Sequence, residues 1–418
     1  MGVGDKLMKI VVRLGDVVEL VKRFEASPAE AMKEVMAQFR EAAGTTLEQL
    51  METEIALFLG QPAEVANKRN GYTVRSFALK AWGTVQVRVP RDRAGRFESR
   101  VLPRQLRYDP ALEKDVALLH LAGLSTRMLS VMSQRILGLR ISAAEVSNAL
   151  KTIVPAAKTF LERPLAGRRW QYLYLDGTNF HIRRSTVERE PTLVVIGVDE
   201  VGCKSVLAMV QGDKESRASW EMVFSSLKER GLDATAVRLG IMDGLPGLGD
   251  AFAEGFPGAR AARCWVHKAR NVFPRVPRRY QGDFKVGWDA VAYAENRAAA
   301  QAAFDALKSR WAKTCDEAVA CMERDLEALL THYDFPKEHW EALRTTNPIE
   351  RVNKEFKRRS KAMETMGPDG LKALLAFTAL RIEYGWASTP ITSNKLTNLV
   401  YRERLEKHIE AVTRALLN

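Results

Sequence analysis

Apolar side chains recur at helical spacing through the first 62 residues of the chain. Ser27 and Glu30 are spaced as a capping box, and Pro28 would occupy the first position of the helix that follows. The pattern ends near Gly60, where glycine and proline interrupt it. We therefore predict a helical arm that serves for dimerisation or for packing.

The pattern changes to a period of two within residues 67–104. Polar and apolar residues alternate over residues 84–89, and Gly71, Gly83 and Gly95 mark turns. Arginine and lysine are frequent in the same segment. It predicts a small basic β element, whose charged face either follows DNA phosphates or is simply solvated.

Three short helices with tight turns are predicted between residues 111 and 153. The first two lie near residues 115–122 and 127–137, and Ser142 caps the third. This succession suggests a helix-turn-helix, whose last helix would enter the major groove of DNA, although many helical domains share it. The polar side chains of the third helix that could face DNA are Ser147, Asn148 and Lys151.

From about residue 168 the pattern is typical of an α/β domain. Residues 193–198 and 205–210 flank a turn and predict a hairpin. The other predicted strands cover residues 170–175, 237–242 and 261–266, and the predicted helices cover residues 219–230 and 247–255.

Residues 288–343 are predicted to be helical and contain Trp288, Trp311 and Trp340. We expect these three side chains to lie in a hydrophobic core, with base stacking as the alternative. A basic helix follows over residues 348–361, and another helix over residues 369–383.

Composition narrows the class of partner. The 418 residues carry a formal net charge of +13, which favours nucleic acid, although anionic lipid or solubility alone would also fit. The 46% apolar content supports packed cores, and no apolar run is long enough to predict a membrane span. The four cysteines are widely spaced and no secretion signal is apparent, so we expect a reducing cytoplasm.

Asp176 and Asp243 each follow an apolar stretch and precede a glycine. Strand ends in α/β sheets present ligand groups, because the loops beyond them are open to solvent. Two carboxylates on neighbouring strands repel each other unless a cation lies between them, and hard oxygen ligands suit Mg²⁺ or Mn²⁺. The alternative is structural, since an aspartate at a strand end can cap the next helix, and this fits Asp243 well.

A third carboxylate is expected on the basic helix. Ile349, Val352 and Phe356 share one face, which would pack on the sheet. Glu350 lies beside that face, whereas Glu355 is rotated from Glu350 by about 140°. We therefore expect Glu350 at the sheet edge near the aspartates, and Glu355 in solvent or paired with a surface arginine.

Cys264 and His267 have the CxxH spacing of half a zinc site, but no second pair with ligand spacing follows. We expect a buried cysteine and a hydrogen-bonded histidine near the active site. A role for His267 at the scissile phosphate stays open.

With these residues the chain resembles the Mutator-type transposases of bacterial insertion sequences, a DDE group with an RNase H-like catalytic core. The resemblance covers nearly the whole chain. It is carried by the blocks GYTVRSFALKAWGTVQVRVPRDRAGRF, AGLSTRMLS, YLYLDGTNFHIRR, GDKESRASWEMVFSSLKERGL, IMDGLPGL, RCWVHKARN and TTNPIERVNKEFKRRS. One departure is Ala262, where relatives often carry glutamine.

Pattern and resemblance together imply a multidomain α+β protein. It would comprise a helical N-terminal region (residues 1–66), a basic β element (67–110) and a helix-turn-helix domain (111–165). An RNase H-like α/β core would follow (166–280), interrupted by an all-helical insertion (281–343). Residues 344–418 would complete that core with the catalytic glutamate helix and the C-terminal helices.

The resemblance also implies the chemistry. Asp176, Asp243 and Glu350 would be catalytic and would hold two divalent ions, Mg²⁺ or Mn²⁺, for attack on phosphodiesters by water and then by a freed 3′-OH. The expected partner is double-stranded DNA, as terminal inverted repeats and as target, in the bacterial cytoplasm at the nucleoid. A homodimer is implied, without a membrane or a small-molecule substrate. The expected phosphate contacts are Arg183, Arg184, Lys268, Arg270, Lys354 and Lys357.

Three other classes of protein stay open. One is a metal-dependent nuclease of the same fold, which would cut DNA but never join a 3′-OH end. Another is a DNA-binding regulator whose catalytic fold is inactive. The third is a structural protein whose carboxylates only cap helices.

Overall fold

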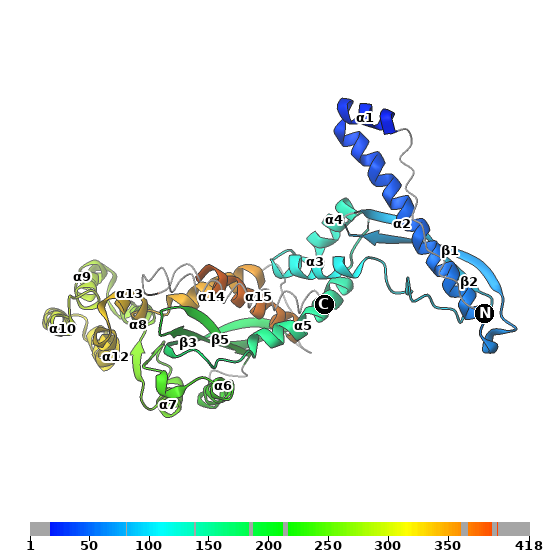
Figure 1. Cartoon of the computed structure of the whole chain (residues 1–418). Helices are drawn as coiled ribbons and strands as arrows, with labels where there is room; N and C mark the ends of the chain where they lie inside the picture. The colour runs from blue at the N-terminus through cyan, green and yellow to red at the C-terminus, as the bar shows by residue number, and fades with distance from the viewer. Residues whose placement is uncertain are drawn as a thin grey trace. The chain divides into compact units, whose positions relative to one another are not determined.

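The computed structural model describes residues 17–80, 82–137, 139–183, 187–211, 216–360, 367–386 and 391 (Figure 1). The chain divides into two compact units, Met1–Ala149 and Leu150–Asn418. Each unit contains helices and strands, so the protein is a mixed α+β protein as predicted. The finer division into six segments stays a prediction. Within the described ranges, no helix has both the length and the apolar character that a membrane span requires.

Two helices begin the described part of the first unit, α1 (Val17–Ala26) and α2 (Pro28–Leu59). Pro28 occupies the start of α2 as predicted, because its missing N–H would have no partner there. The Ser27 side chain makes no capping hydrogen bond, so the predicted capping box is wrong. The helix ends before Gly60, as expected, and a short 3₁₀ turn, η1 (Pro62–Glu64), follows.

The predicted basic β element is an antiparallel hairpin of β1 (Arg69–Leu79) and β2 (Gly83–Asp92). Figure 1 shows α2 lying along this hairpin. The alternation in β2 has the expected cause, because Val85 and Val87 are buried while Gln86 and Arg88 are exposed. The core between hairpin and helix contains Met51, Phe77, Val85, Val87 and Leu102.

The three helices predicted after the hairpin are present as α3 (Pro110–Leu121), α4 (Thr126–Leu137) and α5 (Ala143–Leu161). The cap of α5 is confirmed, since the Glu145 backbone N–H donates to Ser142 Oγ (3.2 Å) and the Ser142 N–H donates to Glu145 Oε2 (2.7 Å). A small core joins the helices and contains Val116, Leu129, Ile141 and Val146.

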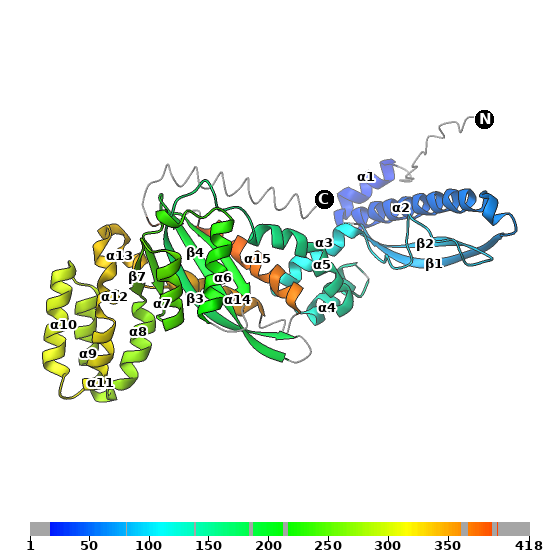
Figure 2. The same cartoon turned by 90° about the horizontal axis from the view of Figure 1, so that it is seen from below.

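The second unit is built on a five-stranded mixed sheet (Figure 2). Its strands are β3 (Trp170–Arg183), β4 (Val187–Asp199), β5 (Lys204–Gln211), β6 (Leu239–Met242) and β7 (Arg260–Arg263). Their order is β5-β4-β3-β6-β7, in which β3, β4 and β5 are antiparallel neighbours and β6 and β7 run parallel to β3. The predicted β4–β5 hairpin is therefore confirmed.

Three strand boundaries differ from the prediction by several residues, and one of them is the start of β4, which lies at Val187 and not at residue 193. The first strand does not end at Asp176, because β3 continues to Arg183 in register with β4. The last strand stops at Arg263, and Trp265 already starts a helix. The apolar residues after Arg263 led us to extend the predicted strand, but they begin α8, where Trp265 is buried. A short apolar run has the same pattern in a buried strand and in a buried helix.

Helices cover both faces of the sheet (Figure 1). On one face, α6 (Arg217–Glu229) and α7 (Pro246–Gly255) contribute Trp220, Phe224 and Phe252 to the core. On the other face lie α14 (Asn347–Ser360) and α15 (Pro368–Trp386). All four helices were predicted within a few residues of these bounds.

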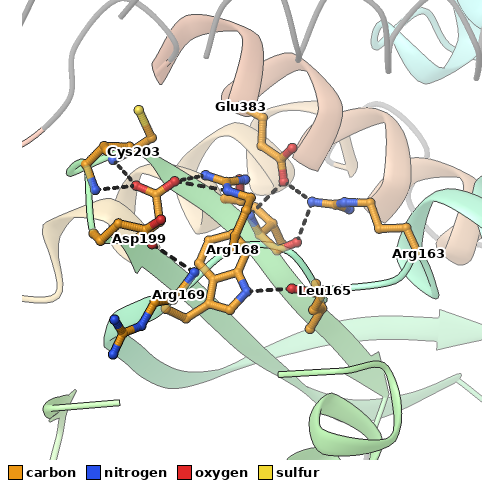
Figure 3. Close-up of polar contacts among 12 residues, drawn as sticks. Arg163, Leu165, Arg168, Arg169, Asp199, Cys203 and Glu383 are labelled. Atoms are coloured by element: carbon orange, nitrogen blue, oxygen red, sulfur yellow. Dashed lines mark hydrogen bonds and ion pairs between the residues drawn. The ribbon is translucent and has the colours of Figure 1, made fainter. Parts of the chain in front are cut away.

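The outer strand β5 contains a bulge at Leu207, where its register with β4 shifts. Three charged side chains bond the backbone groups that β4 leaves free. Glu383 Oε1 accepts from the Val206 N–H (2.7 Å), Arg163 donates to the Val206 carbonyl (3.0 Å), and Arg230 donates to the Leu207 carbonyl (2.7 Å). Arg163 and Glu383 also pair with each other at 2.5 Å (Figure 3). The bulge is therefore closed by side chains from elements outside the sheet.

An all-helical segment follows β7 and lies beside that edge of the sheet (Figure 2). Its helices are α8 (Trp265–Val272), α9 (Gln281–Ala292), α10 (Arg297–Trp311), α11 (Asp316–Arg324), α12 (Leu326–Leu330) and α13 (Trp340–Leu343). Short 3₁₀ turns connect them, namely η3 (Phe273–Arg275), η4 (Arg278–Tyr280), η5 (Thr331–Asp334) and η6 (Lys337–His339). Trp288 and Trp311 are buried in its core and Trp340 packs against it, as predicted, which leaves no face for base stacking on Trp288 or Trp311.

His332 is a buried titratable group in this helical segment, with 1% of its surface exposed. Its Nδ1 donates to the Leu329 carbonyl (2.8 Å), its Nε2 has no hydrogen-bond partner, and Tyr333 packs on the ring at 4.1 Å between centroids. Burial lowers the pKa of His332 from 6.5 to about 4. The neutral imidazole is thus favoured in the folded protein.

The folded pKa of His332 lies below the unfolded value, so its contribution to stability is complete above pH 6.5 and is lost as pH falls toward 4. We expect this group to lower the free energy of unfolding by about 3 kcal/mol over that range. Urea unfolding at pH 7 and pH 4 should show a smaller loss in His332→Asn, whose amide can still donate to Leu329 but does not titrate. Equal losses in both proteins would contradict the prediction.

Candidate active site

The two predicted aspartates lie on adjacent strands of the sheet. In the parallel register of β3 and β6, Leu175 is opposite Met242, so Asp176 and Asp243 are the next residues on each strand. Neighbouring strands are about 4.8 Å apart, which places the two aspartates side by side. Although β3 continues, its pairing with β6 ends at Leu175. Asp176 and Asp243 therefore lie where the two parallel strands stop pairing, at their C-terminal ends. Asp176 is buried and Asp243 half-buried.

Asp243 begins a tight turn into α7. Gly244 has φ +86°, a conformation that favours glycine, and the Leu245 N–H donates to Asp243 Oδ1 (3.1 Å). The N-cap of α7 is Leu245, without a side-chain cap. Asp243 therefore orients its own turn and does not cap the helix, which weakens the structural alternative for this residue.

Cys264 and His267 lie next to this edge. Cys264 continues β7, since its N–H donates to the Met242 carbonyl (2.9 Å), and its Sγ accepts from the N–H and the hydroxyl of Thr346 (both 3.3 Å). Burial alone would raise the pKa of the Cys264 thiol, but hydrogen bonds with His267 and Thr346 outweigh it and the net pKa is lowered. Cys264 and His267 thus contact each other, as a buried cysteine and a hydrogen-bonded histidine.

His267 is affected by the charges of both aspartates and lies near Glu350. Its pKa is raised, first by the hydrogen bond with Cys264 and further by the negative charges of Asp176 and Asp243. Its Nε2 lies 3.9 Å from Glu350 Oε1. The imidazole therefore lies in a negative field that converges from β3, β6 and α14.

Glu350 lies in the first turn of α14, whose buried face has the predicted residues Ile349, Val352 and Phe356. Its Oε1 accepts from Arg270 Nη2 (2.8 Å). Glu355 is held elsewhere, by Arg358 (3.2 Å) and by the buried Arg359. The structure thus places Glu350 next to His267, and it pairs Glu355 with the surface arginine Arg358 as expected and also with the buried Arg359, which was not expected. In the described part of the chain, no three His, Cys, Asp or Glu side chains are close enough together to hold a metal ion.

The residues predicted to contact DNA differ in their exposure to solvent. Lys354 and Lys357 are exposed on α14, and Ser147, Asn148 and Lys151 are exposed on α5. Arg270 is 61% exposed on its side chain and pairs with Glu350. The side chain of Arg183 and the whole of Arg184 lie outside the described residues. Their predicted contacts with DNA stay predictions.

Lys268 is the predicted contact that the structure argues against. Only 3% of it is exposed, and its Nζ pairs with Asp325, which lies between α11 and α12. A lysine held inside the protein cannot reach a DNA phosphate without breaking this pair. Sequence reasoning missed its partner because Asp325 is far from Lys268 in the chain.

Sequence reasoning also missed Arg263 and Thr346. The Arg263 side chain lies over Gly244, and Thr346 donates to the Cys264 sulfur. The only sequence signals were their positions, next to Cys264 and at the start of the basic helix.

The fold and the site together define a mixed α+β protein with carboxylates around one histidine at the edge of a sheet. The chain belongs to the Mutator family of transposases, which matches residues 17–383. This membership confirms the family that the sequence motifs indicated.

Individual transposases align with this chain over most of their length. The transposase for insertion sequence element IS905 of Lactococcus lactis subsp. lactis (strain IL1403) is 33% identical over 329 residues, which is 77% of this chain and 83% of the relative. The transposase for IS1201 of Lactobacillus helveticus is 30% identical over 319 residues, with 75% and 85% covered. The transposase for IS256 in transposon Tn4001 of Staphylococcus aureus is 28% identical over 302 residues, with 71% and 75% covered.

Proposed function

We propose that this chain is a DDE transposase that binds the terminal inverted repeats of an insertion sequence, cleaves DNA strands and transfers their 3′-OH ends. The observation that carries the proposal is the convergence of Asp176, Asp243 and Glu350 on His267. Family membership and the names of the relatives support it. A protein whose carboxylates only capped helices would not need Asp176 and Asp243 at adjacent strand positions near His267.

The fold of the second unit supports an RNase H-like core. Three antiparallel strands are extended by two parallel ones, with helices on both faces, and this is the arrangement that we expect of such a core. The helical segment between β7 and α14 interrupts it in the chain, as the proposed insertion requires. In the first unit and the start of α5, the capped third helix with exposed Ser147 and Asn148 supports the proposed helix-turn-helix.

The donor set suits the proposed metal. Asp176, Asp243 and Glu350 offer only carboxylate oxygens, which Mg²⁺ and Mn²⁺ prefer, and the proposal has two ions per site. Bound ions would activate the attacking oxygen and stabilise charge on the leaving oxygen. Only Oε1 of Glu350 accepts from Arg270, so Oε2 is left to act as a metal ligand. The raised pKa of His267 favours its charged form, which reduces the repulsion among the carboxylates.

Double-stranded DNA is the proposed partner. The net charge of +13 attracts phosphates, and Lys354 and Lys357 are exposed on the helix that carries Glu350. A homodimer is proposed because strand transfer must hold two element ends together. The cytoplasm at the nucleoid is the proposed location.

The test is an assay of the purified chain on labelled duplexes that carry an end of its own element, with Mg²⁺, with Mn²⁺ and with EDTA. We expect metal-dependent nicking at the element end, followed by joining of the 3′-OH to a second strand. Nicking without joining would assign a nuclease instead. Specific binding without cleavage in either metal would assign a regulator.

A further inference from the structure

Arg263 and Gly244 approach each other more closely than any side chain at position 244 would allow. A Cβ atom built on Gly244 would collide with the Arg263 guanidinium. The guanidinium therefore occupies the space that a side chain at position 244 would need, one residue after Asp243. Arg263 reaches this place from the end of β7, where it is in register with Met242 of β6.

The Arg263 guanidinium has little to bind within the protein. Among the described residues its only ionic partner is Asp325, whose Oδ2 is 3.7 Å from Nε, and Nε is buried without a hydrogen-bond partner. Asp325 is shared, because it also holds Lys268. Two cations thus depend on one carboxylate, and the Arg263 guanidinium keeps unused donors.

The other basic side chains of β7 and α8 are engaged differently. Arg260 pairs with Asp334, Lys268 is buried against Asp325, and Arg270 bonds Glu350. The Arg263 side chain is still 16% exposed, so it is not fully enclosed by the protein. A buried or half-buried donor without an acceptor is costly, and a ligand that supplies acceptor oxygens removes that cost.

We propose that Arg263 binds a phosphate of the DNA strand next to the scissile bond, with Asp325 and Gly244 holding its guanidinium in place. This phosphate site rests on the proposed function and assigns it a further contact. Arginine suits the task because its planar donors match two phosphate oxygens at once. Gly244 then has two reasons to be glycine, its positive φ and the guanidinium above it.

The test pairs protein variants with neutral phosphate analogues. A set of duplexes that carry an element end is prepared, and in each duplex one phosphate near the scissile position is replaced by an uncharged methylphosphonate. Binding is measured with Ca²⁺ in place of Mg²⁺, before any strand is cut, for the wild type and for Arg263→Gln. We expect Arg263→Gln to weaken binding of the unmodified duplex about tenfold. One methylphosphonate should weaken the wild type equally and leave the variant unchanged.

Matched controls separate contact from folding. Arg260→Gln removes a charge from the same strand and should show no coupling to any methylphosphonate. Gly244→Ala should reproduce the loss seen in Arg263→Gln, because the new methyl group displaces the guanidinium. Gly167→Ala should bind as the wild type does, since Gly167 has a similar φ of +83° but no atom within 4 Å of a built Cβ. Arg263→Lys keeps the charge and should retain part of the affinity.

The outcomes distinguish this contact from the proposed function. If the effects of Arg263→Gln and of every methylphosphonate simply add in a protein that binds and cuts its element end, the phosphate contact is overturned and the transposase stands. If the wild type does not bind the element end at all, both are overturned. Coupling at one phosphate, absent in Arg260→Gln, supports the contact.

Discussion

Replacing Glu350 with glutamine should lower the rate of metal-dependent strand cleavage at least about a hundredfold, because loss of partners that only orient metal ligands already costs about 10–100-fold. Glutamine keeps the size of the side chain and removes the negative charge that a divalent ion requires. The same change also removes the acceptor of Arg270, an exposed pair worth at most about 1 kcal/mol. The stability of Glu350→Gln should therefore stay close to that of the wild type.

Glu355→Gln is the matched control on the same helix, and its expected effects are reversed. Glu355 pairs with Arg359, which is only 1% exposed, so glutamine leaves a buried guanidinium without its carboxylate. We expect a loss of about 3 kcal/mol in the free energy of unfolding. The cleavage rate per folded molecule should not change, since Glu355 does not face His267.

The measurement combines single-turnover cleavage of the element end with urea unfolding for both variants. Binding of DNA by Glu350→Gln should persist, which separates a catalytic loss from a loss of substrate. If Glu355→Gln loses more cleavage than its loss of folded protein explains and Glu350→Gln keeps the wild-type rate, the third ligand has been assigned to the wrong glutamate. If both variants cut normally, the carboxylate set is wrong.

The parts of the fold that could be predicted are those with a local cause. Alternation in residues 84–89 placed Val85 and Val87 in a core, and helical spacing placed Ile349, Val352 and Phe356 against the sheet. The same spacing separated Glu350 from Glu355. Periodicity works here because each side chain's face follows from its own strand or helix.

The parts that could not be predicted depend on contacts between distant segments. Nothing near Lys268 in the sequence indicates Asp325, and nothing near Gly244 indicates Arg263. Sequence reasoning proposed a phosphate contact for Lys268 because a basic residue in a motif gives no sign of its burial, and the structure argues against that contact. The predicted length of the last strand was wrong because an apolar residue such as Trp265 fits a buried strand and a buried helix equally well.

The bulge in β5 gives the largest expected change in stability. Glu383→Ala leaves the Val206 N–H without its acceptor and Arg163 without its carboxylate, at a site where Glu383 is only 2% exposed. Breaking one partner of a buried pair costs about 3–5 kcal/mol. We expect a loss of that size in the free energy of unfolding, measured with urea at pH 7.

Glu162→Ala is the control, since it removes a glutamate that is exposed and lies 4.0 Å from Lys158. Its cost should be below about 0.5 kcal/mol. The double change Arg163→Met with Glu383→Leu should recover part of the loss, because an apolar pair leaves no unpaired charge in the interior. The Val206 N–H would still lack a partner, so recovery should be incomplete. If Glu383→Ala is as mild as Glu162→Ala, water replaces the carboxylate at the bulge, and the side chains do not secure this edge of the sheet.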